Sequence, residues 1–384
     1  MTAANNALAP AHRHTLTYFD AHLEEKTASL AAGHQVVCCF VNDEVNSAVV
    51  DQFLELGVDL IALRSAGCNN VDLEYVAKCG LSVFHVPAYS PQSVAEHALA
   101  LLLTLNRKTH KVYNRVRDGN FCLEGMSPGF SLAGKTVGIL GTGRIGDSFA
   151  RIMVGLGCHV LGYDVMENPA LLALQKKGNN IAGWGSFKYT SMDEVLRASD
   201  VLSLHMPLTP DTQGIIGGNN LKKMKKGVIL INTSRGGLVD TKAVIEALKT
   251  KHIRAVGLDT YEDEEAFFYR NLSEEIVKDD QLSRLMTLSN VLITPHKGFY
   301  TQEALSAIAS STIASVSDFE GGMKPDSAII YKGTVIKKLQ GSGNSFPDEV
   351  LTTAYTGKGK GLVSTAGLSL PCPDHEYSRE IIVK

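Results

Sequence analysis

The stretch that decides the fold is TVGILGTGRIG, at Thr136–Gly146. Its first half, Thr136–Leu140, is apolar and predicts a buried strand, and Ile145–Leu156 continues as an amphipathic helix. Between them stand three glycines in the order G-x-G-x-x-G, namely Gly141, Gly143 and Gly146. The first allows a tight turn, the second lets a phosphate approach the backbone, and the third lets helix and strand pack closely. The sequence therefore predicts a dinucleotide site, with the pyrophosphate at the helix N-terminus.

An acidic residue follows the next predicted strand, where Asp164 comes directly after His159–Tyr163. A carboxylate at this place bonds the ribose 2′-hydroxyl and repels a 2′-phosphate, so NAD is expected rather than NADP. Arg144 is expected to face the pyrophosphate. The alternative is an ordinary tight turn with a surface aspartate, but the full order of strand, glycines, helix, strand and aspartate favours the cofactor site.

Short apolar runs alternate with helical patterns along most of the chain. Further strands are predicted at Gln35–Phe40, Asp59–Arg64, Leu81–Val86, Val201–Leu204, Val228–Asn232, Arg254–Leu258 and Val291–Thr294. Such alternation predicts an α/β fold with parallel sheets covered by helices on both faces. Pro91 to Asp118 reads as one long helix, closed by Gly119 in the left-handed conformation.

Composition excludes several other classes of protein. Lys and Arg number 37 and Asp and Glu 40, a formal charge of −3, which gives no electrostatic case for nucleic acid or a membrane surface. The longest apolar run, Ala98 to Leu105, is far too short to span a bilayer. The seven cysteines form no C-x-x-C pair and the first residues lack a signal-peptide pattern. We therefore expect no metal site and a cytoplasmic location.

Three chemically useful side chains follow other predicted strands: Arg235, Glu264 and His296. Ligands of open α/β sheets bind outside the carboxyl ends of the strands, so these side chains are expected to meet in one crevice. An arginine can bind a carboxylate and polarise a carbonyl, and a histidine oriented by a carboxylate can donate a proton as hydride arrives. Taken one at a time, Arg235 can be a loop salt bridge, Glu264 a solvated charge and His296 a histidine in a turn. Spacing alone does not decide between these structural roles and a catalytic site.

Together these stretches resemble the D-isomer-specific 2-hydroxyacid dehydrogenases, most closely their D-lactate dehydrogenase branch. The resemblance extends from about Leu16 to Gly322. It rests on RSAGCNNVD at Arg64–Asp72, VPAYSP at Val86–Pro91, AEHALALLLTLNR at Ala95–Arg107, GKTVGILGTGRIG at Gly134–Gly146, LHMPLTPDT at Leu204–Thr212, NTSRGGLVD at Asn232–Asp240, Asp259–Glu264 and His296–Tyr300.

The resemblance implies two doubly wound parallel-sheet domains. A Rossmann-type NAD domain at 113–297 is inserted into a discontinuous, flavodoxin-like substrate domain at 1–112 and 298–322, and 323–384 is expected to be a flexible tail. The implied activity is reversible reduction of pyruvate to D-lactate with NADH, in a homodimer. The alternatives are another 2-oxoacid, such as glyoxylate, hydroxypyruvate or a branched acid, an NAD-sensing corepressor-like binding protein, or an inactive relative.

By the same resemblance, His296 is the general acid, Glu264 its partner and Arg235 the group that binds and polarises the substrate. The implied substrate contacts are Ala66, Gly67, Tyr89 and Phe299. The implied NAD contacts are Gly141, Gly143, Arg144, Ile145, Gly146, Asp164, Met206, Pro207, Thr212, Thr233, Ser234 and Asp259.

The sequence departs from the family at its beginning. Family members have a strand and a helix before the segment that matches Leu16–Asp20, and that strand lies inside the substrate-domain sheet. Here MTAANNALAPAHR stands in front and reads as neither strand nor helix. An interior strand supplies ladder hydrogen bonds and apolar cover, so its absence predicts a substrate domain less stable than the NAD domain.

Overall fold

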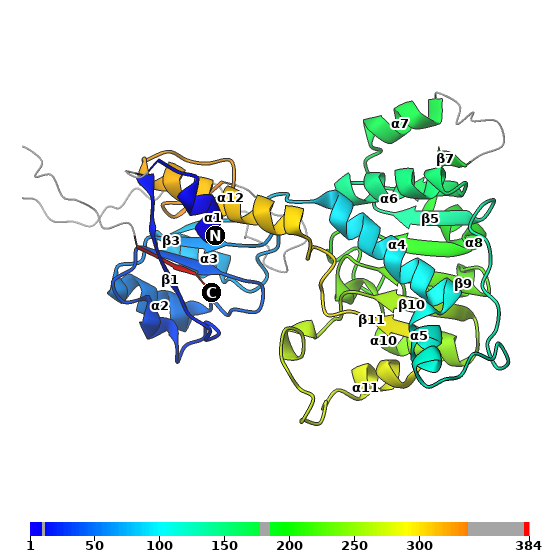
Figure 1. Cartoon of the computed structure of the whole chain (residues 1–384). Coiled ribbons are helices and arrows are strands. Elements are labelled where there is room, and N and C mark those ends of the chain that lie inside the picture. The colour runs from blue at the N-terminus through cyan, green and yellow to red at the C-terminus, as the bar shows by residue number, and fades with distance from the viewer. Residues whose placement is uncertain (10–11, 177–184, 337–379, 384) are drawn as a thin grey trace, which may run out of the picture. The chain divides into compact units, whose positions relative to one another are not determined.

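The computed structural model describes residues 1–9, 12–176, 185–336 and 380–383 (Figure 1). The chain forms two compact units, each built on a seven-stranded sheet. The inserted unit comprises residues 90–305, and the discontinuous unit comprises residues 1–89 together with those from 306 onward. The predicted α/β class is confirmed in both. In the part of the chain that the structure describes, no helix has the length and apolarity needed to cross a membrane.

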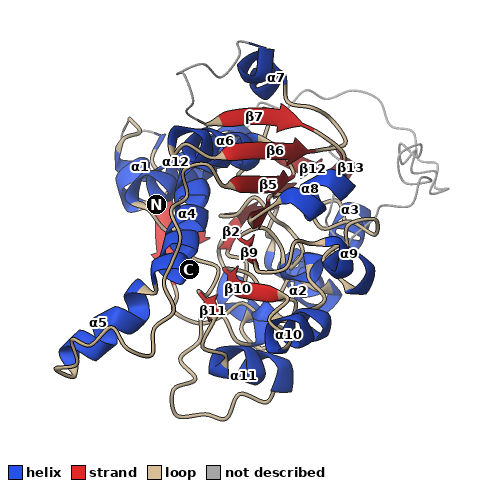
Figure 2. Ribbon diagram, turned by 90° about the vertical axis from the view of Figure 1, so that its right-hand side faces the viewer, coloured by secondary structure: helices blue, strands red, loops and turns tan. Residues whose placement is uncertain are grey.

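Among its described residues, the inserted unit has a sheet of seven strands, which are all parallel. Figure 2 shows strands of this sheet in red. They are β5 (Thr136–Leu140), β6 (His159–Tyr163), β7 (Ser186–Tyr189), β8 (Val201–Leu204), β9 (Val228–Asn232), β10 (Ile253–Leu258) and β11 (Val291–Ile293). Their order in the sheet is β11-β10-β9-β8-β5-β6-β7. The order reverses between β5 and β8, which is the switch point where doubly wound sheets bind ligands. All but β7 were predicted, and β7 was missed.

Alternate residues of these strands face two layers of helices. Ile229 and Ile231 of β9 pack in one core with α4 and α6, and Val228 and Leu230 pack in a second core with α8, α9, α10 and α11. The bounds are α4 (Pro91–Arg107), α6 (Arg144–Gly155), α8 (Met192–Ala198), α9 (Gly218–Lys223), α10 (Thr241–Lys249) and α11 (Asp280–Thr287), with α7 (Pro169–Lys176) beside β7. Burial on both faces is the reason why the inner strands β8 and β9 read as continuous apolar runs.

The prediction of one helix from Pro91 to Asp118 is wrong. The helix breaks at Lys108, whose φ of 54° is left-handed, into α4 and a separate α5 (Thr109–Arg117). The Lys108 ammonium donates a hydrogen bond to the Ser127 carbonyl at 2.6 Å. α4 buries one face in the core whereas α5 buries no residue, so no continuous apolar face holds the two in line. Gly119 is left-handed as predicted, with φ 74°.

The discontinuous unit has the strand order β1-β14-β2-β3-β4-β12-β13. The strands are β1 (Thr15–Tyr18), β2 (Val36–Cys39), β3 (Leu60–Leu63), β4 (Ser82–Phe84), β12 (Ala328–Tyr331), β13 (Thr334–Val335) and β14 (Glu380–Val383). The first four and β14 run parallel, whereas β12 is antiparallel to β4 and to β13. The predictions for β2, β3 and β4 are confirmed, and each observed strand is shorter than predicted by one or two residues at each end.

Helices cover both faces of this sheet too. Val37 and Cys39 of β2 share a core with α2 (Ser47–Leu56), α3 (Leu73–Lys78) and the short helix η2 (Ala28–Ala31). Val36 and Cys38 share a second core with α12 (Gln302–Glu320), and Met1, Ala4 and Leu8 pack against this second core. The first residues were expected to be neither strand nor helix, but Thr2–Asn6 forms α1.

The chain from residue 323 onward was expected to be a tail. The structure instead places β12, β13 and β14 of this stretch in the sheet of the discontinuous unit. The remaining tail positions, 337–379 and 384, lie outside the described residues. β14 occupies an interior position between β1 and β2, so the sheet has a strand where the sequence predicted a gap.

Candidate active site

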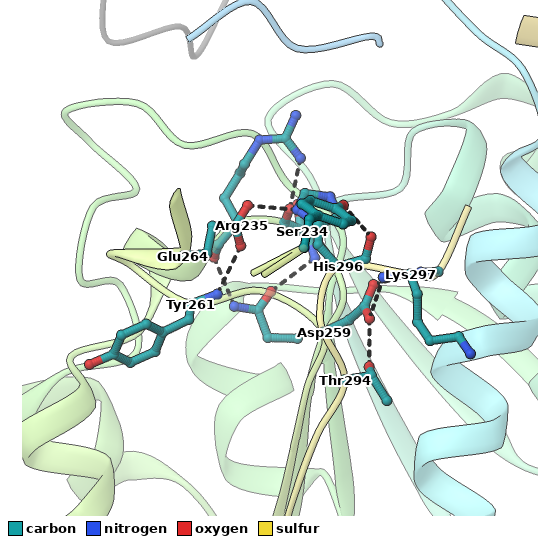
Figure 3. Close-up of polar contacts among 11 residues, drawn as sticks. Ser234, Arg235, Asp259, Tyr261, Glu264, Thr294, His296 and Lys297 are labelled. Atoms are coloured by element: carbon teal, nitrogen blue, oxygen red, sulfur yellow. Dashed lines mark hydrogen bonds and ion pairs between the residues drawn. The ribbon is translucent and has the colours of Figure 1, made fainter. Parts of the chain in front are cut away.

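His296 and Glu264 meet beyond the carboxyl ends of β10 and β11 (Figure 3). His296 Nδ1 lies 2.6 Å from Glu264 Oε1, and both side chains are 23% exposed. The second carboxylate oxygen accepts a hydrogen bond from the Tyr261 amide at 3.0 Å. Glu264 therefore fixes the orientation of the imidazole and occupies Nδ1, so that Nε2 is the ring nitrogen left to serve a ligand.

The turn that carries His296 has an uncommon backbone conformation. Its φ is 47°, in the left-handed region that residues other than glycine rarely adopt. Its amide donates to the Asp259 carbonyl at 2.8 Å, and its carbonyl accepts from the Tyr269 hydroxyl at 2.7 Å. Such a conformation persists where neighbouring contacts enforce it, which is common at functional sites.

The Asp259 carboxylate is the main support of this turn. It accepts hydrogen bonds from the amides of Lys297 and Gly298, at 2.9 and 2.8 Å, and from the Thr294 hydroxyl at 2.5 Å. His97 of α4 contacts the same group, with Nε2 3.2 Å from Asp259 Oδ1. Burial acts to raise the pKa of Asp259, but the hydrogen bonds from His97 and Thr294 outweigh it and hold the pKa below its usual value.

These contacts show what sequence reasoning missed. Asp259 was expected to touch NAD, and its support of the turn of His296 through both carboxylate oxygens was not expected. His97 lies in the AEHALALLLTLNR motif but was given no role. The sequence signal that could have identified His97 is a polar residue within a largely apolar helix. Its contact with Asp259 depends on the packing of α4 on β10 and β11, which the sequence does not show.

Arg235 follows β9 at the same edge of the sheet. Its guanidinium donates to the Ser234 carbonyl at 2.7 Å, and Figure 3 shows it on the side of the Glu264–His296 pair that faces away from the sheet. The next residue, Gly236, begins the short helix η3 (Gly236–Leu238). A Cβ there would overlap the backbone of Tyr261, so glycine is required for the Arg235 loop to lie against the segment that leads to Glu264.

The glycine-rich turn has the geometry of a phosphate cradle. Gly141 has φ 92°, and a Cβ on it would lie 2.5 Å from the His205 carbonyl, while a Cβ on Gly146 would overlap the Gly141 carbonyl. Around Gly143, by contrast, a Cβ would meet nothing within 4 Å. The first amides of α6 follow directly, which gives an anion an open approach to them. Arg144 is exposed and Ile145 half-buried here.

Asp164 lies at the end of β6, as predicted, and also holds the glycine-rich turn. One oxygen accepts from the Thr142 amide at 2.6 Å and from its hydroxyl at 3.2 Å, and the other accepts from the Met166 amide at 3.2 Å. Tyr189 of β7, which sequence reasoning missed, donates to the Thr142 hydroxyl at 2.8 Å. A carboxylate has about four acceptor sites in all, so Asp164 retains capacity for a ribose hydroxyl.

The loops after β8 and β9 complete this edge. Met206 is buried and Pro207 exposed, and the Thr212 hydroxyl closes their loop by donating to the Pro207 carbonyl at 2.7 Å. The Ser234 hydroxyl connects the two loops by donating a hydrogen bond to the Met206 carbonyl at 2.5 Å. Thr233 Oγ1 is buried and has no hydrogen-bond partner among the described residues. An unpaired buried hydroxyl at the carboxyl edge of the sheet fits a site that a bound NAD completes.

The predicted substrate contacts are divided between the two units. In the discontinuous unit, Ala66 and Gly67 form the loop after β3, where the Ala66 carbonyl lies 2.9 Å from His85 Nδ1 and the Gly67 carbonyl accepts from the Ser65 hydroxyl at 2.7 Å. Tyr89 is half-buried in the same unit. Phe299 belongs to the inserted unit, three residues beyond His296.

Reduction of a carbonyl needs a dinucleotide and a proton donor at one place, and the sheet of the inserted unit brings both to its carboxyl edge. Fold and site thus define the class of protein as a dinucleotide-dependent oxidoreductase. The family model "D-isomer specific 2-hydroxyacid dehydrogenase, NAD binding domain" matches residues 99–298. The chain belongs to the D-isomer-specific 2-hydroxyacid dehydrogenase family, and its cofactor is NAD.

Relatives cover most of the chain. 2-Hydroxyacid dehydrogenase A of Aspergillus oryzae is 48% identical over 79% of this chain and 84% of its own. The pyruvate reductase structure of Chlamydomonas reinhardtii is 42% identical with a TM-score of 0.74, over 80% of this chain and 89% of that one. The Aquifex aeolicus D-lactate dehydrogenase, complexed with NAD and lactic acid, is 35% identical with a TM-score of 0.67, over 80% and 87%.

Proposed function

We propose that the protein is a D-lactate dehydrogenase, which reduces pyruvate to D-lactate with NADH and catalyses the reverse reaction. The observation that carries the proposal is the 2.6 Å contact of His296 with Glu264, placed on the same sheet edge as the glycine-rich turn. The names of the Chlamydomonas and Aquifex relatives support pyruvate and lactate as the substrate pair.

In this proposal His296 is the general acid. When bound, NADH supplies a hydride to the keto carbon of the substrate. His296 donates the proton from Nε2 to the keto oxygen, while Glu264 holds Nδ1 and stabilises the positive charge of the ring. Arg235 binds the substrate carboxylate and polarises the carbonyl. In the oxidation of lactate, His296 accepts the hydroxyl proton.

Further residues position the two ligands. The amides of Ala66 and Gly67 bind the substrate carboxylate, and Tyr89 and Phe299 line the pocket. NAD is held by the glycine-rich turn, by Asp164 at the ribose, and by the loops after β8 and β9. The residues assigned to NAD are Gly141, Gly143, Arg144, Ile145, Gly146, Asp164, Met206, Pro207, Thr212, Thr233, Ser234 and Asp259, the last through the turn that it supports.

The test is loss of NADH absorbance with the purified full-length protein and pyruvate. His296→Ala is expected to lower kcat by about 10²–10⁴, the usual contribution of general acid catalysis, with NADH binding unchanged by fluorescence titration. His159→Ala is the matched control, because His159 is exposed at the amino end of β6, opposite the site. Full turnover in His296→Ala would contradict the assigned role.

The same assay separates D-lactate dehydrogenase from the alternatives. Higher kcat/KM with glyoxylate, hydroxypyruvate or a branched 2-oxoacid than with pyruvate identifies another member of the family. Tight NADH binding without turnover of any 2-oxoacid identifies an NAD-sensing binding protein or an inactive relative. The His296–Glu264 pair favours the enzyme, because binding of NAD alone does not need a proton donor at this edge.

We also propose that the protein is a homodimer in the cytoplasm. Helix α5 and the following loop expose four large apolar side chains, which a second copy would cover: Tyr113 (60%), Val116 (44%), Phe121 (77%) and Leu123 (80%). Phe121→Ser with Leu123→Ser is expected to shift the sedimentation coefficient to that of a monomer. The described cysteines form no disulfide with one another, as is usual in a reducing compartment.

A further inference from the structure

Strand β14 comes from the far end of the chain, yet it lies inside the sheet of the discontinuous unit. It runs parallel to β1 on one side and to β2 on the other. Ile381 pairs with Leu16 and with Val36, and Ile382 pairs with Thr17 and with Val37. Consecutive strands usually neighbour one another, so a strand drawn from a remote segment into an interior position requires its own explanation.

Without β14 the sheet would be divided. β1 stands at the end of the strand order, and β14 is its one ladder partner among the described residues. β2 is buried on both faces, with Val36 and Cys38 in one core and Val37 and Cys39 in the other. The edge of such a strand lies within the unit, so its free amides and carbonyls would lack water as well as a partner.

The segment that fills this position suits it by sequence. Ile381, Ile382 and Val383 are β-branched residues in succession, which favour extended backbone. Residues 337–379 separate β14 from the rest of its unit along the chain. Recognition therefore depends on main-chain hydrogen bonds to two strand edges, as when a peptide is added to a sheet.

We propose that the gap between β1 and β2 is a binding site for an extended, β-branched peptide, and that residues 380–383 of the same chain are its ligand. The chain completes its discontinuous unit by strand complementation from its C-terminal segment. This site can be tested apart from NADH binding, because the His296–Glu264 pair and the glycine-rich turn belong to the inserted unit.

Hydrogen exchange compares three forms of the full protein: the intact chain, a chain lacking residues 380–384, and a control chain lacking residues 356–360. The first deletion is expected to speed exchange of the β1 and β2 amides by at least about tenfold, since these open more readily once unpaired. Exchange of β5 and β8 in the inserted unit, and NADH binding, should stay unchanged. The control deletion should match the intact chain.

A synthetic peptide of residues 375–384 supplies the second measurement. Added to the chain lacking 380–384, it is expected to restore protection of β1 and β2, whereas the same peptide with Ile382→Pro should not, because proline removes a ladder donor. If the deleted chain is insoluble, refolding with and without the peptide gives the same comparison. Equal protection of β1 and β2 in the two deletion chains, or equal effects of the two peptides, would overturn the proposal.

Discussion

The half-buried His205 beneath the glycine-rich turn predicts that acid destabilises the inserted unit. His205 Nδ1 is buried and has no hydrogen-bond partner among the described residues, while Nε2 lies 2.9 Å from the Ser203 hydroxyl. The ring packs on Phe149, with centroids 5.1 Å apart. Burial lowers the pKa of His205 from 6.5 to about 3, because a charged imidazolium would lose its hydration there.

The magnitude follows from linkage between protonation and folding. Since the folded pKa is depressed, the contribution of neutral His205 is complete above pH 6.5 and is lost progressively as the pH falls from 6.5 towards 3. One pH unit corresponds to about 1.4 kcal/mol, so at about pH 5 the free energy of unfolding falls by about 2 kcal/mol through this residue. That is a large share of a net stability of roughly 5–15 kcal/mol.

The assay is hydrogen exchange of the β5 and β8 amides at about pH 7.5 and pH 5, converted to free energies of opening. His205→Gln does not titrate, so its stability is expected to fall by about 2 kcal/mol less than that of the native protein over this interval. His159→Gln, at an exposed position, should keep the native pH dependence. An equal loss in His205→Gln and the native protein would refute the reasoning.

Three further predictions concern the cofactor site and the catalytic turn. Asp164→Ser is expected to decrease the ratio of kcat/KM for NADH to kcat/KM for NADPH, because the carboxylate that repels the 2′-phosphate is lost. An unchanged ratio would contradict the assignment of Asp164 to the ribose site. Gly143→Ala is expected to fold normally but bind NADH more weakly in a fluorescence titration, whereas Gly141→Ala should fail to fold stably, since only the former has room for a Cβ. His97→Ala is expected to lower kcat by a larger factor than it raises KM for pyruvate, because Asp259 loses a hydrogen-bond donor while the His296 side chain stays intact. His97→Asn is expected to restore kcat. A native kcat in His97→Ala would refute the positioning role of His97.

The dinucleotide half of the fold could be predicted in detail from the sequence. β5, β6, β8 and β9 have the bounds that were predicted, because each is a short, largely apolar run, and β8 and β9 are buried at every position. The placement of the glycines, Asp164, Glu264 and His296 at one edge of the sheet could also be predicted, since the carboxyl ends of parallel strands lie together. These features depend on neighbours in sequence and on a simple rule of topology.

Other features depended on contacts between segments far apart in the chain. No local pattern marked the left-handed Lys108, which ended the predicted long helix, because a cation in a polar stretch is compatible with a helix. The support of His296 by Asp259 and His97 joins α4 to the end of β10, and only packing brings them within hydrogen-bond distance.

The discontinuous unit illustrates the same limit most clearly. The sequence by itself determined that a sheet containing β2, β3 and β4 had to exist. Only the tertiary structure decided that Glu380–Val383 enters between β1 and β2. The physical reason is that the sequence of these four residues does not specify which strands they pair with. Strand pairing uses backbone groups that every residue shares, so the position of β14 depends on which buried strand edge remains unpaired.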